Sequence, residues 1–243
     1  MKIAVPKEVA PGETRVALTP ESVGKLKKVG HTISVQSGAG LTSNLLDKAY
    51  EDAGATIVTE VDKLYAEANC VLKVQRPMEN PSLGKNELDV IQTGTLLIGF
   101  LQPLTNHQLM RALAEKKITA FAMESVPRIT RAQSMDALSS MSTVAGYKAV
   151  LLAANLQAKF FPMFTTAAGT IKPAKVLIIG AGVAGLQAIA TARRLGAVVE
   201  AFDTRPVVKE QVQSLGASFV ELEVDHANAQ DAGGYAKELS ADH

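Results

Sequence analysis

The most informative motif of the chain is Lys175-Val-Leu-Ile-Ile-Gly180-Ala-Gly182-Val-Ala-Gly185-Leu-Gln-Ala-Ile-Ala. An uninterrupted apolar run stops at a glycine-rich turn and continues as an alanine-rich segment that favours a helix. Gly180, Gly182 and Gly185 have the spacing G-x-G-x-x-G, in which glycines permit a tight turn, close approach of a pyrophosphate and close helix–strand contact. The sequence therefore predicts a strand, a phosphate-binding turn and a helix whose N-terminus attracts anions.

A second apolar run, residues 197–202, ends in an acid. Asp203 follows Gly185 by 18 residues, close to the offset of about 20 at which a carboxylate binds the ribose hydroxyls of a dinucleotide. A carboxylate repels a 2′-phosphate, so Asp203 favours NAD(H), although Arg205 could pair with such a phosphate. A tight strand–helix turn without a ligand is the plainer alternative. We expect three further residues to line the same site: Val183, Ala184 and Thr204.

The composition excludes several classes of function. The 243 residues are 47% apolar, enough for one or two domains with sizeable cores, and the net charge is +1. We expect no nucleic-acid partner, because Lys and Arg form no polyanion-binding cluster. The single cysteine, Cys70, excludes an intrachain disulfide framework, and the dispersed histidines predict no metal site. Residues 176–192 are apolar but shorter than a membrane span of about 20 residues, so the chain is expected to be soluble by itself.

Residues 1–138 are expected to form an N-terminal α/β domain. Short apolar runs alternate with helical patterns, which predicts a parallel sheet covered by helices on both faces. One helix should begin after Thr19, with Pro20 in its first turn, and end before Gly30.

Residues 139–243 are expected to form a second Rossmann-like parallel-sheet domain, which binds the dinucleotide and is incomplete at its C-terminus. A long helix over residues 132–160 should enter it, followed by an irregular loop at 161–173. A doubly wound dinucleotide domain has two βαβαβ halves, and the sequence reaches His243 after about three strands. Either the chain is truncated or a second chain completes the sheet, and the isolated chain could then be inactive.

Several stretches carry a family resemblance that spans the chain. Residues 3–8 (IAVPKE) and 13–20 (ETRVALTP) resemble the opening shared by alanine dehydrogenases and the NAD(H)-binding subunit (domain I) of proton-translocating transhydrogenases. Residues 127–140 (PRITRAQSMDALSS) resemble the Arg–Gln–Asp loop of the transhydrogenase subunit. Residues 201–206 (AFDTRP) also match that subunit, and 233–237 (GGYAK) resemble its mobile nucleotide-covering loop.

Two departures separate the chain from alanine dehydrogenases. Gln75 stands where the resemblance places their substrate-binding lysine, and Gln102 stands where it places their catalytic histidine. Oxidation of an amino acid needs a group that takes up protons, which an amide cannot do. Hydride exchange between two nicotinamides needs only alignment and electrostatics, so the substitutions suit transhydrogenation. Arg15, whose counterpart grips a substrate carboxylate in alanine dehydrogenases, is expected to have a structural or relic role.

The resemblance also implies the roles of the residues near the reacting ring. Gln133 would hold the nicotinamide carboxamide and ribose against the partner ring, and Asp136 would orient Arg128 through a charge-assisted pair. Ser139 would be a neighbouring hydroxyl contact. By spacing alone, the same residues could be a solvated helix start with Thr130 as its cap.

The resemblance implies the NAD(H)-binding component of a proton-translocating NAD(P) transhydrogenase. Hydride would pass directly from NADH to NADP⁺ on a partner component, and a membrane proton-channel component would couple the transfer to proton movement. Gly234 and Tyr235 would belong to a lid that excludes water. A homodimer is implied, attached through its partners to the cytoplasmic side of the inner or plasma membrane. Two alternatives stay open: an alanine-dehydrogenase-like oxidoreductase, and a non-catalytic nucleotide-binding assembly subunit.

Overall fold

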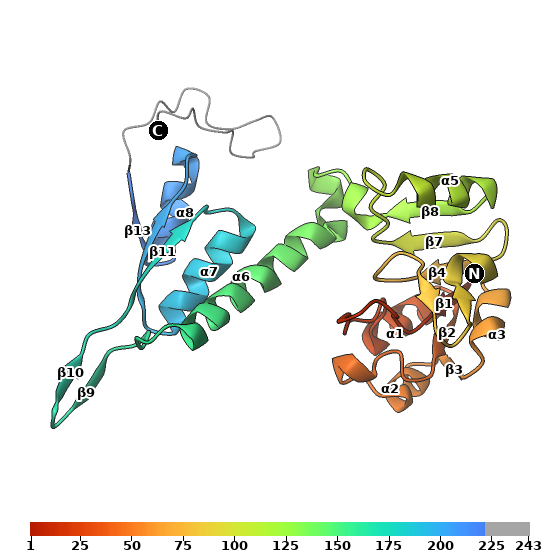
Figure 1. Cartoon of the computed structure of the whole chain (residues 1–243), viewed down its shortest axis with the longest axis horizontal. Coiled ribbons are helices and arrows are strands. Elements are labelled where there is room, and N and C mark those ends of the chain that lie inside the picture. Colours follow the sequence, from red (N-terminus) through yellow and green to blue (C-terminus); the bar gives the residue numbers. More distant parts are fainter. Residues whose placement is uncertain (222–243) are drawn as a thin grey trace. The chain divides into compact units, whose positions relative to one another are not determined.

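The computed structural model describes residues 1–221, which include two parallel sheets (Figure 1). Contacts between residues divide the chain into two compact units, Met1–Met135 and Asp136–His243. The predicted boundary between residues 138 and 139 lies in the first turn of helix α6 (Ala137–Leu156). The predicted α/β class is confirmed, with a parallel sheet in each unit.

The first unit has a six-stranded parallel sheet with the order β3-β2-β1-β4-β7-β8. Its strands are β1 (Lys2–Val5), β2 (Thr32–Gln36), β3 (Thr56–Val58), β4 (Cys70–Leu72), β7 (Leu96–Gly99) and β8 (Thr119–Ala122). The strand order reverses between β1 and β4, and ligands of open α/β sheets bind outside the carboxyl ends of the strands at such a point.

Short helices and one small hairpin connect these strands. The helices are α1 (Pro20–Lys28), α2 (Asp47–Asp52), α3 (Val61–Ala66), α4 (Glu87–Val90) and α5 (His107–Glu115), with single 3₁₀ turns η1 (Leu41–Ser43) and η2 (Met123–Ser125). The hairpin pairs β5 (Glu79–Asn80) with β6 (Lys85–Asn86). Helix α1 confirms the predicted signals, because the Thr19 hydroxyl accepts the Ser22 N–H at 3.3 Å and Gly30 ends the helix at φ +89°.

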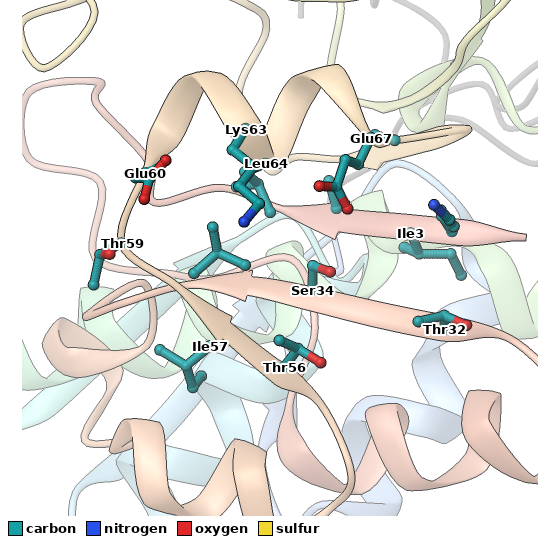
Figure 2. A pocket seen from close by; sticks show the side chains of 14 residues that line it. Ile3, Thr32, Ser34, Thr56, Ile57, Thr59, Glu60, Lys63, Leu64 and Glu67 are labelled. Carbon is teal, nitrogen blue, oxygen red and sulfur yellow. The ribbon is translucent and has the colours of Figure 1, made fainter.

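A cavity separates part of this sheet from helix α3 at strands β2 and β3. Thr32, Ser34 and Thr56 line one face, while Ile33 and Val35 are buried on the other. The cavity, of about 510 Å³, lies on the polar face beside α3, as Figure 2 shows. Helix α3 packs against β2 and β3 on this face and forms the other wall of the cavity. The alternation of polar and apolar residues along β2 matches this arrangement, because it suits a strand with one face in contact with water.

The second unit contains the three-stranded parallel sheet β11-β12-β13. The strands of this sheet are β11 (Lys175–Ile179), β12 (Val198–Phe202) and β13 (Ser218–Phe219). The unit also contains α6, α7 (Val183–Arg194), the 3₁₀ turn η4 (Pro206–Val208), α8 (Lys209–Ser214) and a β-hairpin described below. Ile189 and Ala192 of α7 pack in one core with Val199 and Ala201 of β12. Among residues 1–221, β11 pairs only with β12, and its Leu177 and Ile179 side chains are exposed.

Helix α6 is shorter than the predicted helix over 132–160. It begins after Asp136, and the preceding segment Thr130–Met135 is a 3₁₀ helix, η3. Gly146 brings α6 against α7 so closely that a Cβ there would lie 2.1 Å from the Ala184 carbonyl oxygen. This helix of 20 residues, which contains an 18-residue window with a mean hydropathy of 1.2, is long and apolar enough to cross a membrane by length and composition alone.

The segment expected to be an irregular loop contains a β-hairpin, so the loop prediction is wrong. Strands β9 (Phe164–Thr166) and β10 (Gly169–Ile171) pair antiparallel in Figure 1. The β-branched residues Thr165, Thr170 and Ile171 favour strands, and Gly169, at φ +134°, begins the returning strand.

Candidate functional site

The glycine-rich turn lies between β11 and α7, as the sequence predicts. Gly180 has φ +92°, and its N–H donates to the Phe202 carbonyl of β12 at 2.8 Å. Gly182 is the N-cap residue of α7. A Cβ on Gly185 would lie 1.8 Å from the Gly180 carbonyl oxygen, so a side chain has no room there. The turn leaves backbone N–H groups at the start of α7, where an anion can bind.

Asp203 lies at the carboxyl end of β12 and is tied directly to this turn. Its Oδ2 accepts the Ala181 N–H at 2.7 Å, and its Oδ1 accepts the Arg205 N–H at 2.8 Å. The Arg205 guanidinium is bidentate, with Nε 2.9 Å from Oδ1 and Nη2 2.9 Å from Oδ2. Burial alone would raise the pKa of the Asp203 carboxyl, but these hydrogen bonds outweigh burial and lower it. Asp203 is therefore a fixed, ionised acceptor.

A cavity of about 210 Å³ opens beside Asp203 at the ends of β12 and β13. Phe202, Phe219 and Val220 give it apolar walls, and Pro206 lies at the start of η4. The charged residues Asp203, Lys209 and Glu221 also line it, and Lys209 forms an ion pair with Glu221. A slot with apolar walls and the Asp203 carboxylate beside it has the chemistry to hold a flat heterocycle attached to a sugar. Of the other predicted contacts, Thr204 and Ala184 are half-buried, and Val183 is exposed on the first turn of α7.

The residues predicted near the reacting ring fall in both units. Arg128 and Gln133 belong to the first unit and are exposed, with Gln133 on η3. In the second unit, Asp136 caps α6: its Oδ1 accepts the Ser139 N–H at 3.0 Å and its Oδ2 accepts the Ser139 hydroxyl at 2.7 Å. Asp136, rather than Thr130, is thus the helix cap. The expected Asp136–Arg128 pair would link the two units and stays a prediction, and the predicted lid residues Gly234 and Tyr235 lie outside the described residues.

A buried charge network, which sequence reasoning missed, lies at the end of β4. The Lys73 ammonium is 3.0 Å from Glu87 and 3.3 Å from Glu8, and all three side chains are buried. Glu8 also accepts the Val74 N–H at 2.6 Å and the Gln75 N–H at 3.2 Å. Burial raises the pKa of the Glu8 carboxyl, although Lys73 opposes the shift. The network fixes the segment after β1 to the end of β4.

The two glutamines at this sheet edge are engaged in contacts within the first unit. Gln75 Nε2 donates to Glu13 at 2.7 Å, and the same carboxylate receives Arg15 Nη2 at 2.7 Å. Hydrogen bonding by Arg15 lowers the pKa of Glu13 to about 2. Gln102 has φ +55°, and its Oε1 accepts from Arg76 at 3.0 Å. Both amides therefore act as hydrogen-bonding groups within the fold.

Comparison with known proteins identifies the family. Residues 4–145 match the model "Alanine dehydrogenase/PNT, N-terminal domain", and residues 149–239 match "Alanine dehydrogenase/PNT, C-terminal domain". The chain belongs to the alanine dehydrogenase/PNT family. The resemblance drawn from the residues is confirmed, and both matched domains are shared with dehydrogenases of this family.

Curated relatives cover both branches of the alanine dehydrogenase/PNT family. The chain is 53% identical to an NAD(P) transhydrogenase subunit alpha, first part, of Rhodospirillum rubrum, over 98% of this chain and 62% of that protein. It is 46% identical to the protein of the same name in Rickettsia prowazekii, over 100% of this chain and 63% of that one. The alanine dehydrogenase of Methanococcus maripaludis is 34% identical, over 84% of this chain and 53% of its own length. The chain thus spans less than two thirds of these relatives.

Solved structures agree with this assignment. A transhydrogenase from Sinorhizobium meliloti has a TM-score of 0.85 and 49% identity, covering 92% of this chain and 62% of that chain. An L-alanine dehydrogenase has a TM-score of 0.77 and 31% identity, covering 90% and 60%. Both sheets therefore have the architecture of this family.

Proposed function

We propose that the chain is the NAD(H)-binding component of a proton-translocating NAD(P) transhydrogenase. Hydride passes from the nicotinamide of NADH directly to NADP⁺ on a partner component. The observation that carries the proposal is the glycine-rich turn joined to Asp203 through the Ala181 N–H at 2.7 Å. The relatives named as transhydrogenase alpha subunits, at 46–53% identity over nearly the whole chain, support the choice of reaction.

Binding of NAD(H) would use groups that the second unit already holds in place. The N–H groups at the start of α7 bind the pyrophosphate, because Gly182 has no side chain in its path. Asp203 accepts the ribose hydroxyls, and the apolar cavity beside Phe202 and Phe219 holds the adenine. These groups bind and orient the cofactor, and the hydride chemistry itself belongs to the nicotinamide.

The reacting ring would be held by the residues that the family resemblance indicates. Gln133 contacts the nicotinamide carboxamide, Asp136 orients Arg128, and Ser139 supplies a hydroxyl next to its partner Asp136. Gly234 and Tyr235 close over the nucleotide and exclude water. Alignment of two nicotinamides needs no proton acceptor, so positioning and electrostatics are sufficient.

An alanine-dehydrogenase-like reaction is the second candidate, favoured by the 34% identical relative and the structural neighbour. Its chemistry requires an acid–base group at the substrate. Gln75 and Gln102 are amides and bond to Glu13 and Arg76 within the first unit, which argues against this reaction.

The partners proposed with this function are an NADP(H)-binding component, a membrane proton channel and a second copy of the chain. The chain would be attached to the cytoplasmic side of the membrane through them. Names of relatives such as "subunit alpha" support an assembly of several subunits.

Two measurements test the proposal. NADH is titrated into the chain by fluorescence, and the chain is combined with an NADP(H)-binding component to follow hydride transfer to an NADP⁺ analogue. Binding and transfer are expected. Turnover of alanine, or of pyruvate with ammonia, would favour the second candidate. Stable pairing with a partner without NADH binding would instead indicate an assembly subunit.

A further inference from the structure

The Asp203 carboxylate uses its hydrogen-bonding capacity fully in this structure. A carboxylate offers about four acceptor positions on its two oxygens. Two are taken by backbone N–H groups, from Ala181 to Oδ2 at 2.7 Å and from Arg205 to Oδ1 at 2.8 Å. These two bonds fix the carboxylate at the turn. The remaining two are taken by the Arg205 side chain, Nε to Oδ1 and Nη2 to Oδ2, both at 2.9 Å.

A bound ribose would need the same two positions. Its 2′- and 3′-hydroxyls are adjacent donors that bind a carboxylate side by side, as the two nitrogens of the guanidinium do here. The backbone donors cannot give way without moving the turn or the end of β12. The Arg205 side chain is therefore the group that must leave.

The Arg205 guanidinium also lies next to the glycine over which a pyrophosphate would pass. The nearest atom to a Cβ built on Gly182 is Arg205 Nη2, at 4.0 Å. The Arg205 side chain is 16% exposed, so it is held at the mouth of the turn. A guanidinium released from Asp203 at this place has a phosphate within reach as its new partner.

We propose that the Arg205 side chain is an internal occupant of the ribose site, which the nucleotide displaces when its hydroxyls bind to Asp203. The inference rests on the proposed function, because it takes Asp203 as the ribose-binding residue. When only a fraction of the sites is free to bind a ligand, the apparent dissociation constant equals the intrinsic constant divided by that fraction. Arg205 therefore weakens the binding of a ligand that needs Asp203 and has no phosphate to offer in return.

Adenosine isolates this exchange, because it carries the ribose diol and no phosphate. Arg205→Met removes the guanidinium but keeps an unbranched side chain. We expect this variant to bind adenosine about tenfold more tightly, which corresponds to the free energy of one charge-assisted hydrogen bond. 2′,3′-Dideoxyadenosine lacks both hydroxyls and should bind equally to both proteins. Arg194→Met is the matched control: it removes the same charge from an exposed position in the last turn of α7 and should change neither affinity.

The affinities are measured on the full chain by letting each nucleoside displace bound NADH, whose fluorescence reports the displacement. Circular dichroism verifies that each variant is folded. Weaker adenosine binding to Arg205→Met would overturn the inference, since Arg205 would then be a ligand of the nucleoside. An equal gain for dideoxyadenosine would also overturn it, because the side chain would merely block the cavity. If Arg205→Met does not fold, Arg205→Lys replaces it. A single ammonium cannot make the two parallel hydrogen bonds of the guanidinium, so a smaller gain in adenosine affinity is expected. No gain in adenosine affinity would refute the inference.

Failure of the proposed function is a separate result. If the wild-type chain binds neither NADH nor adenosine, the proposed nucleotide site is refuted, and the inference is refuted with it. A wild-type chain that binds both, with no gain in Arg205→Met, overturns the inference alone.

Discussion

Gly185→Ala should destabilise the second unit, although alanine is the better helix former. The new Cβ would lie 1.8 Å from the Gly180 carbonyl oxygen, a backbone atom in a turn that the Gly180–Phe202 hydrogen bond of 2.8 Å holds to β12. Overpacking of this kind costs about 1–3 kcal/mol. The higher helix propensity of alanine relative to glycine offsets about 1 kcal/mol of this cost. Because the contact of 1.8 Å is with a backbone atom, the cost lies at the upper end of that range, and a net loss of about 2 kcal/mol remains. Each kcal/mol lowers Tm by about 4–8 °C for a domain of about 100 residues.

Gly182→Ala is the matched control at the same turn. Gly182 has φ −77°, which alanine adopts readily, and the nearest atom to its Cβ would be Arg205 Nη2 at 4.0 Å. Its stability should change little, while NADH binding weakens because the methyl group lies in the path of the pyrophosphate. Thermal unfolding by circular dichroism and NADH titration separate the two effects. An unfolding temperature of Gly185→Ala equal to that of the wild type would refute this account of the turn. An NADH affinity of Gly182→Ala equal to that of the wild type would also refute it.

Three further changes test other regions of the structure. Gln133→Asn should slow hydride transfer in the reconstituted complex with little change in NADH affinity, and equal losses of both would contradict a positioning role. Gly146→Ala should lower the unfolding temperature, because its Cβ would lie 2.1 Å from the Ala184 carbonyl oxygen, and an unchanged Tm would show that α6 can move away. Glu13 has its pKa lowered from 4.5 to about 2 in the folded protein, so its ionised form stabilises the fold above about pH 4.5 and this contribution is lost towards pH 2. The stability difference between wild type and Glu13→Gln should shrink over that range in denaturant titrations, and a difference independent of pH would argue against the Arg15 contact.

Features encoded by neighbouring residues could be predicted from the sequence. The turn at 180–185 and the cap at Thr19 depend on residues a few positions apart, so their spacing is sufficient. The position of Asp203 could also be predicted, because the residue that follows an apolar strand lies at the carboxyl edge of the sheet. Its contact with Ala181 confirms the pairing of β11 with β12.

Features that depend on distant residues could not be predicted in this way. Glu8 meets Lys73 and Val74 across more than 60 positions, and no local pattern marks a lysine that becomes fully buried between carboxylates. The hairpin at Phe164–Ile171 was missed because two three-residue strands are too short for a clear alternation. Gly146 is one small residue among many in its segment, and only the contact with α7 shows that a side chain has no room there.

The one-sided pairing of β11 has a practical use. Within residues 1–221 this strand bonds to β12 alone, so every second amide of β11 points in the plane of the sheet away from β12. Those amides should exchange with deuterium rapidly when that side meets water, and slowly when another strand lies against it. Hydrogen exchange along five residues therefore reports whether the sheet has gained a neighbour, whichever polypeptide supplies it.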